Sequence, residues 1–156
     1  MPVFVDSNVL VYARDTRDPQ KHERATAWVR HLWETGEGRL SAQVLHEFYV
    51  TTTRKLRPGL TPATARADVR DLSAWRPVLL GIEGLEAAWA LEDRFGLSFW
   101  DALIVAAAHV ARCEVLLTED LQDGMDLDGV RVVDPFGSQE PPATASAPSR
   151  GGQDPR

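Results

Sequence analysis

The sequence has one cysteine, only two lysines and no long apolar run, and each shortage excludes a class of protein. Cys113 alone cannot form an internal disulfide, and four histidines without cysteine partners do not make the usual structural zinc site. No apolar stretch reaches the roughly 18 residues that a membrane-spanning helix needs. The first residues lack the basic start of a secretory signal. We therefore expect a protein of the cytoplasm, where thiols stay reduced.

The charge balance is acidic, with a formal net charge of −6. Proteins that bind nucleic acids mainly through the phosphates are usually basic, so the acidic charge balance argues mildly against this mode of binding. The argument weakens if several carboxylates are gathered to hold metal ions, because bound cations reverse the local sign of the charge. A nuclease is compatible with this composition once part of the acidic charge is assigned to metal binding.

Short apolar runs alternate with helical patterns along most of the chain. Strands are predicted at residues 3–5, 39–40, 77–80, 115–117 and 130–133, and helices at residues 7–12, 19–35, 42–56, 62–75, 82–95 and 99–112. This alternation predicts an α/β fold, a three-layer α/β/α sandwich with a mostly parallel central sheet. From Gly137 the composition shifts to Pro, Ala, Ser, Gly and Gln. We therefore expect one domain at residues 1–136 and a disordered tail at residues 137–156.

Four acidic residues stand at strand ends or on neighbouring helices: Asp6, Glu47, Asp101 and Asp120. Taken alone, each can be explained by an ordinary structural role. Asp6 could cap the following helix, and Asp101 could form a capping box with Ser98. Glu47 could lie on a solvated helix face, and Asp120 could belong to an ordinary turn. Together they are placed to converge at one edge of the sheet, where the carboxyl ends of parallel strands meet.

Carboxylates gathered in one cleft would repel one another, and burial would raise their pKa values. A hard divalent cation relieves both costs, and oxygen ligands without thiolate or imidazole suit Mg²⁺ or Mn²⁺. Such an ion activates a water, polarises a phosphoryl oxygen and stabilises the leaving oxygen. The residues therefore favour the hydrolysis of phosphodiesters.

The four acids lie in segments with a distinctive order and spacing: residues 5–12, 41–50, 97–108 and 116–121. Their sequences, VDSNVLVY, SAQVLHEFYV, LSFWDALIVAAA and LLTEDL, resemble the four motifs of PIN-domain nucleases. One such motif would be a weak signal, but four in order are a strong one. The likeness covers residues 3 to about 136 and is greatest to the VapC-type toxins of bacterial type II toxin–antitoxin systems.

The resemblance implies that Mg²⁺ or Mn²⁺ is held by the four acids: Asp6, Glu47, Asp101 and Asp120. It implies that Ser7, Asn8 and Thr118 support them with hydroxyl or amide groups. It further implies an endoribonuclease that leaves 5′-phosphates, a VapB-type antitoxin that covers the cleft, and a homodimer.

Two alternatives stay open. The fourth acid could be Glu119 or Asp123, although the motif register favours Asp120. The chain could also be a PIN-fold binding module that holds metal without turnover and regulates transcription with its antitoxin. An aspartyl-phosphate phosphatase is disfavoured, because Asn8 stands where such enzymes need a second acid. The intact acids favour the ribonuclease, in which metal-activated water attacks the RNA phosphodiester in line.

Overall fold

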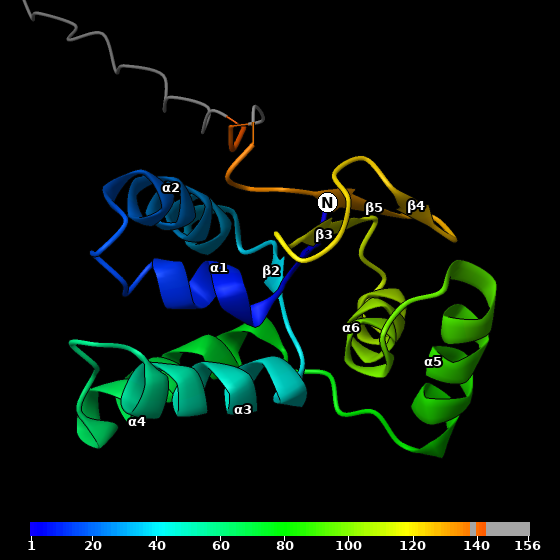
Figure 1. Cartoon of the computed structure of the whole chain (residues 1–156), viewed down its shortest axis with the longest axis horizontal. Coiled ribbons are helices and arrows are strands. Elements are labelled where there is room, and N and C mark those ends of the chain that lie inside the picture. The colour runs from blue at the N-terminus through cyan, green and yellow to red at the C-terminus, as the bar shows by residue number, and fades with distance from the viewer. Residues whose placement is uncertain (138–139, 143–156) are drawn as a thin grey trace, which may run out of the picture.

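The computed structural model describes residues 1–137 and 140–142. The strands are β1 (Val3–Val5), β2 (Gly38–Arg39), β3 (Val115–Leu117), β4 (Asp126–Leu127) and β5 (Val130–Val133). The α-helices are α1 (Ser7–Tyr12), α2 (Pro19–Thr35), α3 (Ala42–Val50), α4 (Pro62–Leu72), α5 (Ile82–Phe95) and α6 (Phe99–Val110). A π-helix, η1 (Thr51–Lys55), continues α3, and a 3₁₀-helix, η2 (Ser73–Trp75), continues α4. In Figure 1, α1 to α4 lie to the left of α5 and α6, and α6 lies below β3 and β5.

The sheet has the strand order β2-β1-β3-β5-β4, and only β4 runs antiparallel to its neighbour. Val5 pairs with Leu117, which in turn pairs with Val133, so three parallel strands end level with one another. The ladder continues past these ends, because the Asp6 N–H donates to the Leu117 carbonyl at 3.0 Å and the Thr118 N–H donates to the Val133 carbonyl at 3.2 Å. The predicted α/β fold with a mostly parallel sheet is confirmed, and its carboxyl edge brings Asp6 beside Thr118.

The helices begin where the sequence indicates, but α3 and α4 give way to η1 and η2 before their predicted ends, and α6 ends at Val110. At α2, α3, α4 and α6 a side-chain oxygen accepts a hydrogen bond from the N–H three residues later: the caps are Asp18, Ser41, Thr61 and Ser98. Helices α2 and α5 end at Gly36 and Gly96, whose φ angles are 70° and 67°. Glycine adopts this left-handed conformation without the steric cost of a Cβ.

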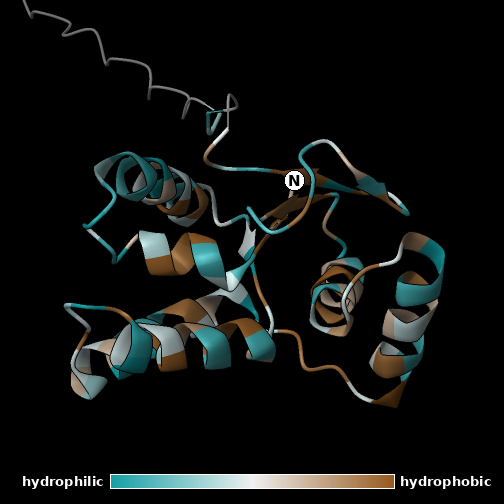
Figure 2. Ribbon diagram, viewed as in Figure 1, coloured by the Kyte–Doolittle hydropathy of each residue, from teal (hydrophilic) through white to brown (hydrophobic). Residues whose placement is uncertain are grey.

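The core lies between the strands and the helices that cover them. Phe4 and Val5 of β1 are fully buried, as are Leu116 and Leu117 of β3. Helix α6 buries residues on every side over its middle turns, as predicted for a central helix. Figure 2 shows hydrophobic residues on the strands and along α6, whereas the outer turns of α2 are hydrophilic. The core therefore fixes the strand ends from which the acidic residues project.

Two strand predictions need correction. The strand predicted at residues 77–80 is wrong, because only Val78 forms a single parallel bridge, to Ser41. Leu79 is 84% exposed, so this apolar run does not mark a buried strand. The short strand β4 was not predicted, because two residues with one acid carry no apolar pattern. The strand predicted at residues 39–40 begins one residue earlier, at Gly38.

Gly38 lies against the indole ring of Trp75. A Cβ at this position would stand 2.5 Å from Trp75 Cδ2, and Trp75 is buried and packs on Trp33 with ring centroids 5.0 Å apart. We expect Gly38→Ala to destabilise the protein by about 1–3 kcal/mol, through overpacking, and to lower the urea midpoint. Gly81→Ala is the matched control, since its Cβ would meet only Glu83 Oε2 at 3.5 Å. Equal midpoints for the two variants would contradict this prediction.

The domain boundary and the tail remain predictions. All the helices and strands of the described residues lie between residues 3 and 133. Most of the tail expected at residues 137–156 lies outside the described residues, which include only 137 and 140–142 of it. Within the described part of the chain, no helix is both long and apolar enough to cross a membrane.

Candidate active site

Asp6 lies at the point where β1 ends and α1 begins. Its Oδ1 accepts the Ser7 N–H at 2.7 Å, and its Oδ2 accepts the Thr118 hydroxyl at 2.8 Å. The residue is only 4% exposed. The side chain thus caps α1, which is the structural role predicted for it. No cation within residues 1–137 and 140–142 forms an ion pair with it. The result is a buried carboxylate with a fixed direction and an uncompensated charge.

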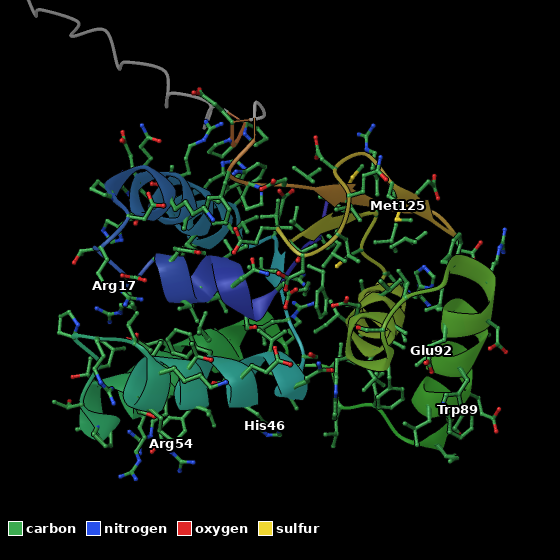
Figure 3. The ribbon with its side chains drawn as sticks, viewed as in Figure 1. Arg17, His46, Arg54, Trp89, Glu92 and Met125 are labelled. Carbon is green, nitrogen blue, oxygen red and sulfur yellow. The ribbon has the colours of Figure 1, made fainter. Side chains whose placement is uncertain are left out.

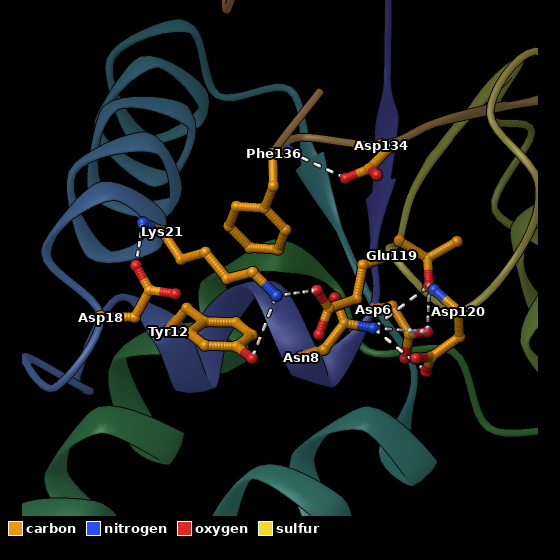
Figure 4. Close-up of polar contacts among 10 residues, drawn as sticks. Asp6, Asn8, Tyr12, Asp18, Lys21, Glu119, Asp120, Asp134 and Phe136 are labelled. Atoms are coloured by element: carbon orange, nitrogen blue, oxygen red, sulfur yellow. Dashed lines mark hydrogen bonds and ion pairs between the residues drawn. The ribbon is translucent and has the colours of Figure 1, made fainter. Parts of the chain in front are cut away.

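Thr118 joins the turn after β3 to this carboxylate. It is fully buried, and its hydroxyl accepts the Asp120 N–H at 3.1 Å and the Asn8 Nδ2–H at 3.1 Å while it donates to Asp6. These three bonds use the whole hydrogen-bonding capacity of a hydroxyl. Asn8 Nδ2 also donates to Asp120 Oδ2 at 3.2 Å. One hydroxyl and one amide therefore connect the first and fourth motifs (Figure 4).

The three acids that compete for the fourth position have different partners. Figure 4 shows Asp120 beside Asp6, whereas Glu119 reaches toward Lys21. Glu119 Oε2 accepts a hydrogen bond from Lys21 Nζ at 2.7 Å. Asp123 accepts the backbone N–H of residue 134 at 2.9 Å. The geometry brings Asp120, and neither of its competitors, into contact with the residues around Asp6.

Glu47 projects from α3, and both of its carboxylate oxygens accept hydrogen bonds. Ser7 Oγ donates to Oε2 at 2.7 Å, and Gln43 Nε2 donates to Oε1 at 2.8 Å. Ser7 directly follows Asp6, so the second motif meets the first through this hydroxyl. Gln43 Nε2 also donates to the Trp100 carbonyl at 3.5 Å, which links α3 to the start of α6.

Asp101 is the third residue of α6, and its surroundings differ from those of the other acids. Its backbone N–H donates to Ser98 Oγ at 3.2 Å. Among the residues that the structure describes, no hydrogen bond or ion pair engages its carboxylate. The capping box that would explain this acid is therefore only half formed, and the carboxylate is free for a ligand. Among the described residues, no hydrogen bond joins the Asp101 side chain to Asp6, Glu47 or Asp120, so its place in the site stays a prediction.

Burial raises the pKa of Asp6 to about 7, against an ordinary value of 3.8. The hydrogen bonds from Thr118 and the Ser7 N–H lower this pKa, and the negative charges of Asp120 and Glu47 raise it. The charges of Asp120 and Glu47 therefore act on Asp6, and a nearby cation would favour its ionised form.

The side chains around Asp6 offer the type of ligand atom that a hard metal ion prefers, but their carboxylates are not tightly clustered. In the described part of the chain, no three His, Cys, Asp or Glu side chains are clustered tightly enough to hold an ion. The hydroxyl of Ser7 and the amide of Asn8 stand between the carboxylates instead. The donors are nevertheless all oxygens, which suits Mg²⁺ or Mn²⁺. Asn8 Oδ1 is also buried without a hydrogen-bond partner, so it offers a further oxygen once the amide turns.

Two contacts around the site were not predicted from the sequence. Gln43 lies one helical turn before Glu47, so their hydrogen bond follows the i, i+4 spacing and could have been inferred. The Lys21–Glu119 pair joins residues 98 positions apart, and no local pattern marks it. The hydrogen bond from Lys21 to Glu119 raises the pKa of Lys21, so the ammonium group stays protonated.

Known proteins resemble this chain in sequence and in fold. The family model of the PIN domain matches residues 3–122. A toxin–antitoxin complex from Klebsiella pneumoniae contains a chain with 21% identity and a TM-score of 0.61, over 86% of this chain and 98% of that one. Mycobacterium tuberculosis VapC20, a toxin that cleaves the sarcin–ricin loop, shares 23% identity with a TM-score of 0.55, over 73% of this chain and 86% of that one. No curated protein sequence matches the chain.

Proposed function

The chain belongs to the PIN domain family, and from this premise we propose that it is a metal-dependent endoribonuclease that hydrolyses RNA phosphodiester bonds. The observation that carries the proposal is the buried carboxylate of Asp6 at the carboxyl edge of the sheet, with Glu47 and Asp120 close enough to raise its pKa. A buried, uncompensated acid destabilises the fold. Metal-assisted hydrolysis is the chemistry that makes use of such a group.

We assign metal binding to the four acids Asp6, Glu47, Asp101 and Asp120, with Ser7, Asn8 and Thr118 in support. Mg²⁺ or Mn²⁺ held there supplies a Lewis acid that polarises a phosphoryl oxygen and lowers the pKa of water. The protein supplies orientation. Thr118 and the Ser7 N–H fix both oxygens of Asp6, while Ser7 Oγ and Gln43 fix those of Glu47. Partners of this kind hold ligands in one direction and raise metal affinity.

We further propose that the chain is the toxin of a toxin–antitoxin pair. Two solved structures of similar fold are a toxin–antitoxin complex and an RNA-cleaving toxin. In this setting its partner is a VapB-type antitoxin, it acts in the cytoplasm, and it forms a homodimer. Its substrate is RNA, and the sarcin–ricin loop is the first target to test.

The Asp101 carboxylate gives the sharpest test of this proposal, because nothing in the described residues engages it. We expect Asp101→Asn to lower Mg²⁺-dependent cleavage of RNA at least tenfold, roughly the effect of a lost metal ligand or its partner. The thermal unfolding midpoint should stay within a few degrees of that of the wild type. Cleavage is measured on total RNA and on a sarcin–ricin loop hairpin, with Mg²⁺ and with EDTA.

Asp93→Asn is the matched control, because it makes the same change at an exposed position of α5. Full cleavage by both variants would remove Asp101 from the site. If neither RNA is cleaved by the wild type while Mg²⁺ still raises its unfolding midpoint, the nuclease proposal fails. The alternative, a metal-binding module that acts through its antitoxin, would then hold.

A further inference from the structure

An open groove of about 290 Å³ begins at the candidate active site and runs between α1 and η1. Ser7 and Asn8 line the end that meets the site, and Thr51 and Lys55 of the π-helix line the opposite wall. The groove is therefore continuous with the residues around Asp6. On the basis of the proposed nuclease function, the occupant of this groove is a part of the RNA strand.

The charges of the groove are paired except for one. Its two acids are Asp15 and Glu119. Arg17 donates to both oxygens of Asp15 at 2.9 and 3.0 Å, and Lys21 donates to Glu119 at 2.7 Å. Within residues 1–137 and 140–142, Lys55 forms no ion pair. Among the described charged residues that line the groove, only Lys55 is without a partner, so the wall formed by η1 is the part of the groove that attracts an anion.

The π-helix presents one free hydroxyl beside this ammonium group. Thr52 Oγ1 donates to the Phe48 carbonyl at 2.8 Å, and Thr53 Oγ1 donates to the Tyr49 carbonyl at 2.6 Å. Thr51 lines the groove, and in the described residues its hydroxyl makes no such bond. A π-helix is rare and is frequently found at functional sites. Here it ends in Lys55 and begins with Thr51 on the same wall.

The aromatic residue of the groove is already engaged. Lys21 Nζ lies 4.7 Å from the centroid of the Tyr12 ring, and Phe136 meets the same ring edge-on with centroids 5.0 Å apart. These contacts occupy part of the Tyr12 ring and leave less of it for a base to stack on. The groove therefore suits a phosphate of the backbone rather than a base.

We propose that this groove binds the phosphate next to the cleaved bond of a single-stranded RNA, with the Lys55 ammonium group and the Thr51 hydroxyl as its ligands. Phosphate contacts of this kind fix the register of the strand without reading its sequence. Asp15 and Glu119 stay neutralised by their own partners, so they do not oppose the bound phosphate. Lys55 thus acts in substrate binding and leaves the chemical step to the acids.

The test is the binding of a fluorescein-labelled single-stranded RNA of about twelve nucleotides, followed by anisotropy in EDTA so that cleavage does not consume the probe. We expect Lys55→Ala to weaken binding about three- to tenfold and to lower the slope of log K against log salt by about 0.7. Lys55→Arg should bind like the wild type. Arg54→Ala is the matched control, because Figure 3 shows Arg54 on the outer side of the helical layer, away from Arg17.

The outcomes separate this proposal from the nuclease proposal. Loss of binding in Lys55→Ala, with no RNA cleaved by the wild type, supports the groove and overturns the nuclease. Where cleavage is seen, KM should rise in Lys55→Ala while kcat stays unchanged. Wild-type binding by both Lys55→Ala and Lys55→Glu would overturn the groove proposal. An equal loss in Arg54→Ala would also overturn it, since total charge alone would then explain the effect.

Discussion

Replacing Asp6 with asparagine is expected to lower metal-dependent RNA cleavage about a thousandfold or more and, in the absence of metal, to make the protein more stable above pH 7. The loss of cleavage follows from removing a charged oxygen at the centre of the site, where a metal ligand supplies several kcal/mol of transition-state stabilisation. The gain in stability follows from the same carboxylate, because its burial is unfavourable when it is ionised.

The direction of the pH dependence follows from the raised pKa. Burial, the largest cause, raises the pKa of Asp6 from 3.8 to about 7. Between these pH values the folded protein keeps a proton that the unfolded chain has released, so stability falls as pH rises from about 4 to about 7. Above pH 7 the buried, ionised carboxylate lowers the free energy of unfolding by about 4 kcal/mol, as expected for a pKa shift of this size. Below pH 4 this destabilisation is absent.

Urea unfolding at pH 5 and at pH 8 measures this effect. Asp6→Asn should exceed the wild type by a few kcal/mol at pH 8 and by much less at pH 5. Asp18→Asn is the matched control, because Asp18 also caps a helix but is only half-buried, and asparagine caps as well as aspartate. Mg²⁺ should stabilise the wild type and leave Asp6→Asn unchanged. If Asp6→Asn is less stable than the wild type at pH 8, burial of the ionised carboxylate is not the main effect of Asp6 on stability.

The convergence of the first and fourth motifs could be predicted from the sequence because it depends on two strand ends. Residues 3–5 and 115–117 are purely apolar, which indicates buried parallel strands, and the residue after each then falls at the same sheet edge. The contacts of Asp6 with Thr118 and of Asn8 with Asp120 agree with that expectation.

The parts of the structure that escaped prediction depend on contacts between distant segments. The motif register favoured Asp120 over Glu119 and Asp123, but the pairing of Glu119 with Lys21, 98 positions away, has no local pattern that could predict it. Residues 77–80 have the composition of a strand, yet the sheet offers only Ser41 as a neighbour to Val78. Composition shows which residues can form a strand, but whether they do so depends on a sheet edge that lies close enough to pair with them.

Thr118→Val is expected to lower RNA cleavage about a hundredfold, which is the upper range for the loss of a group that orients a metal ligand. Valine has nearly the same shape, but it removes the bond to Asp6 and leaves Asn8 and the Asp120 N–H without their acceptor. The lost bond had lowered the pKa of Asp6, so this pKa should rise further. Because metal ligands must be deprotonated, more Mg²⁺ should be needed for half-maximal cleavage, and the difference should be larger at pH 6.5 than at pH 8.

Two further variants separate this orienting role from a loss of stability. Thr118→Ser keeps the hydroxyl and should retain most of the activity and the Mg²⁺ requirement of the wild type. Thr52→Val makes the same change at another fully buried threonine, whose hydroxyl donates to the Phe48 carbonyl. It should lower stability by about 1 kcal/mol without changing the Mg²⁺ requirement. If Thr118→Val and Thr52→Val differ only in stability, Thr118 holds the fold together and does not orient Asp6 for metal binding.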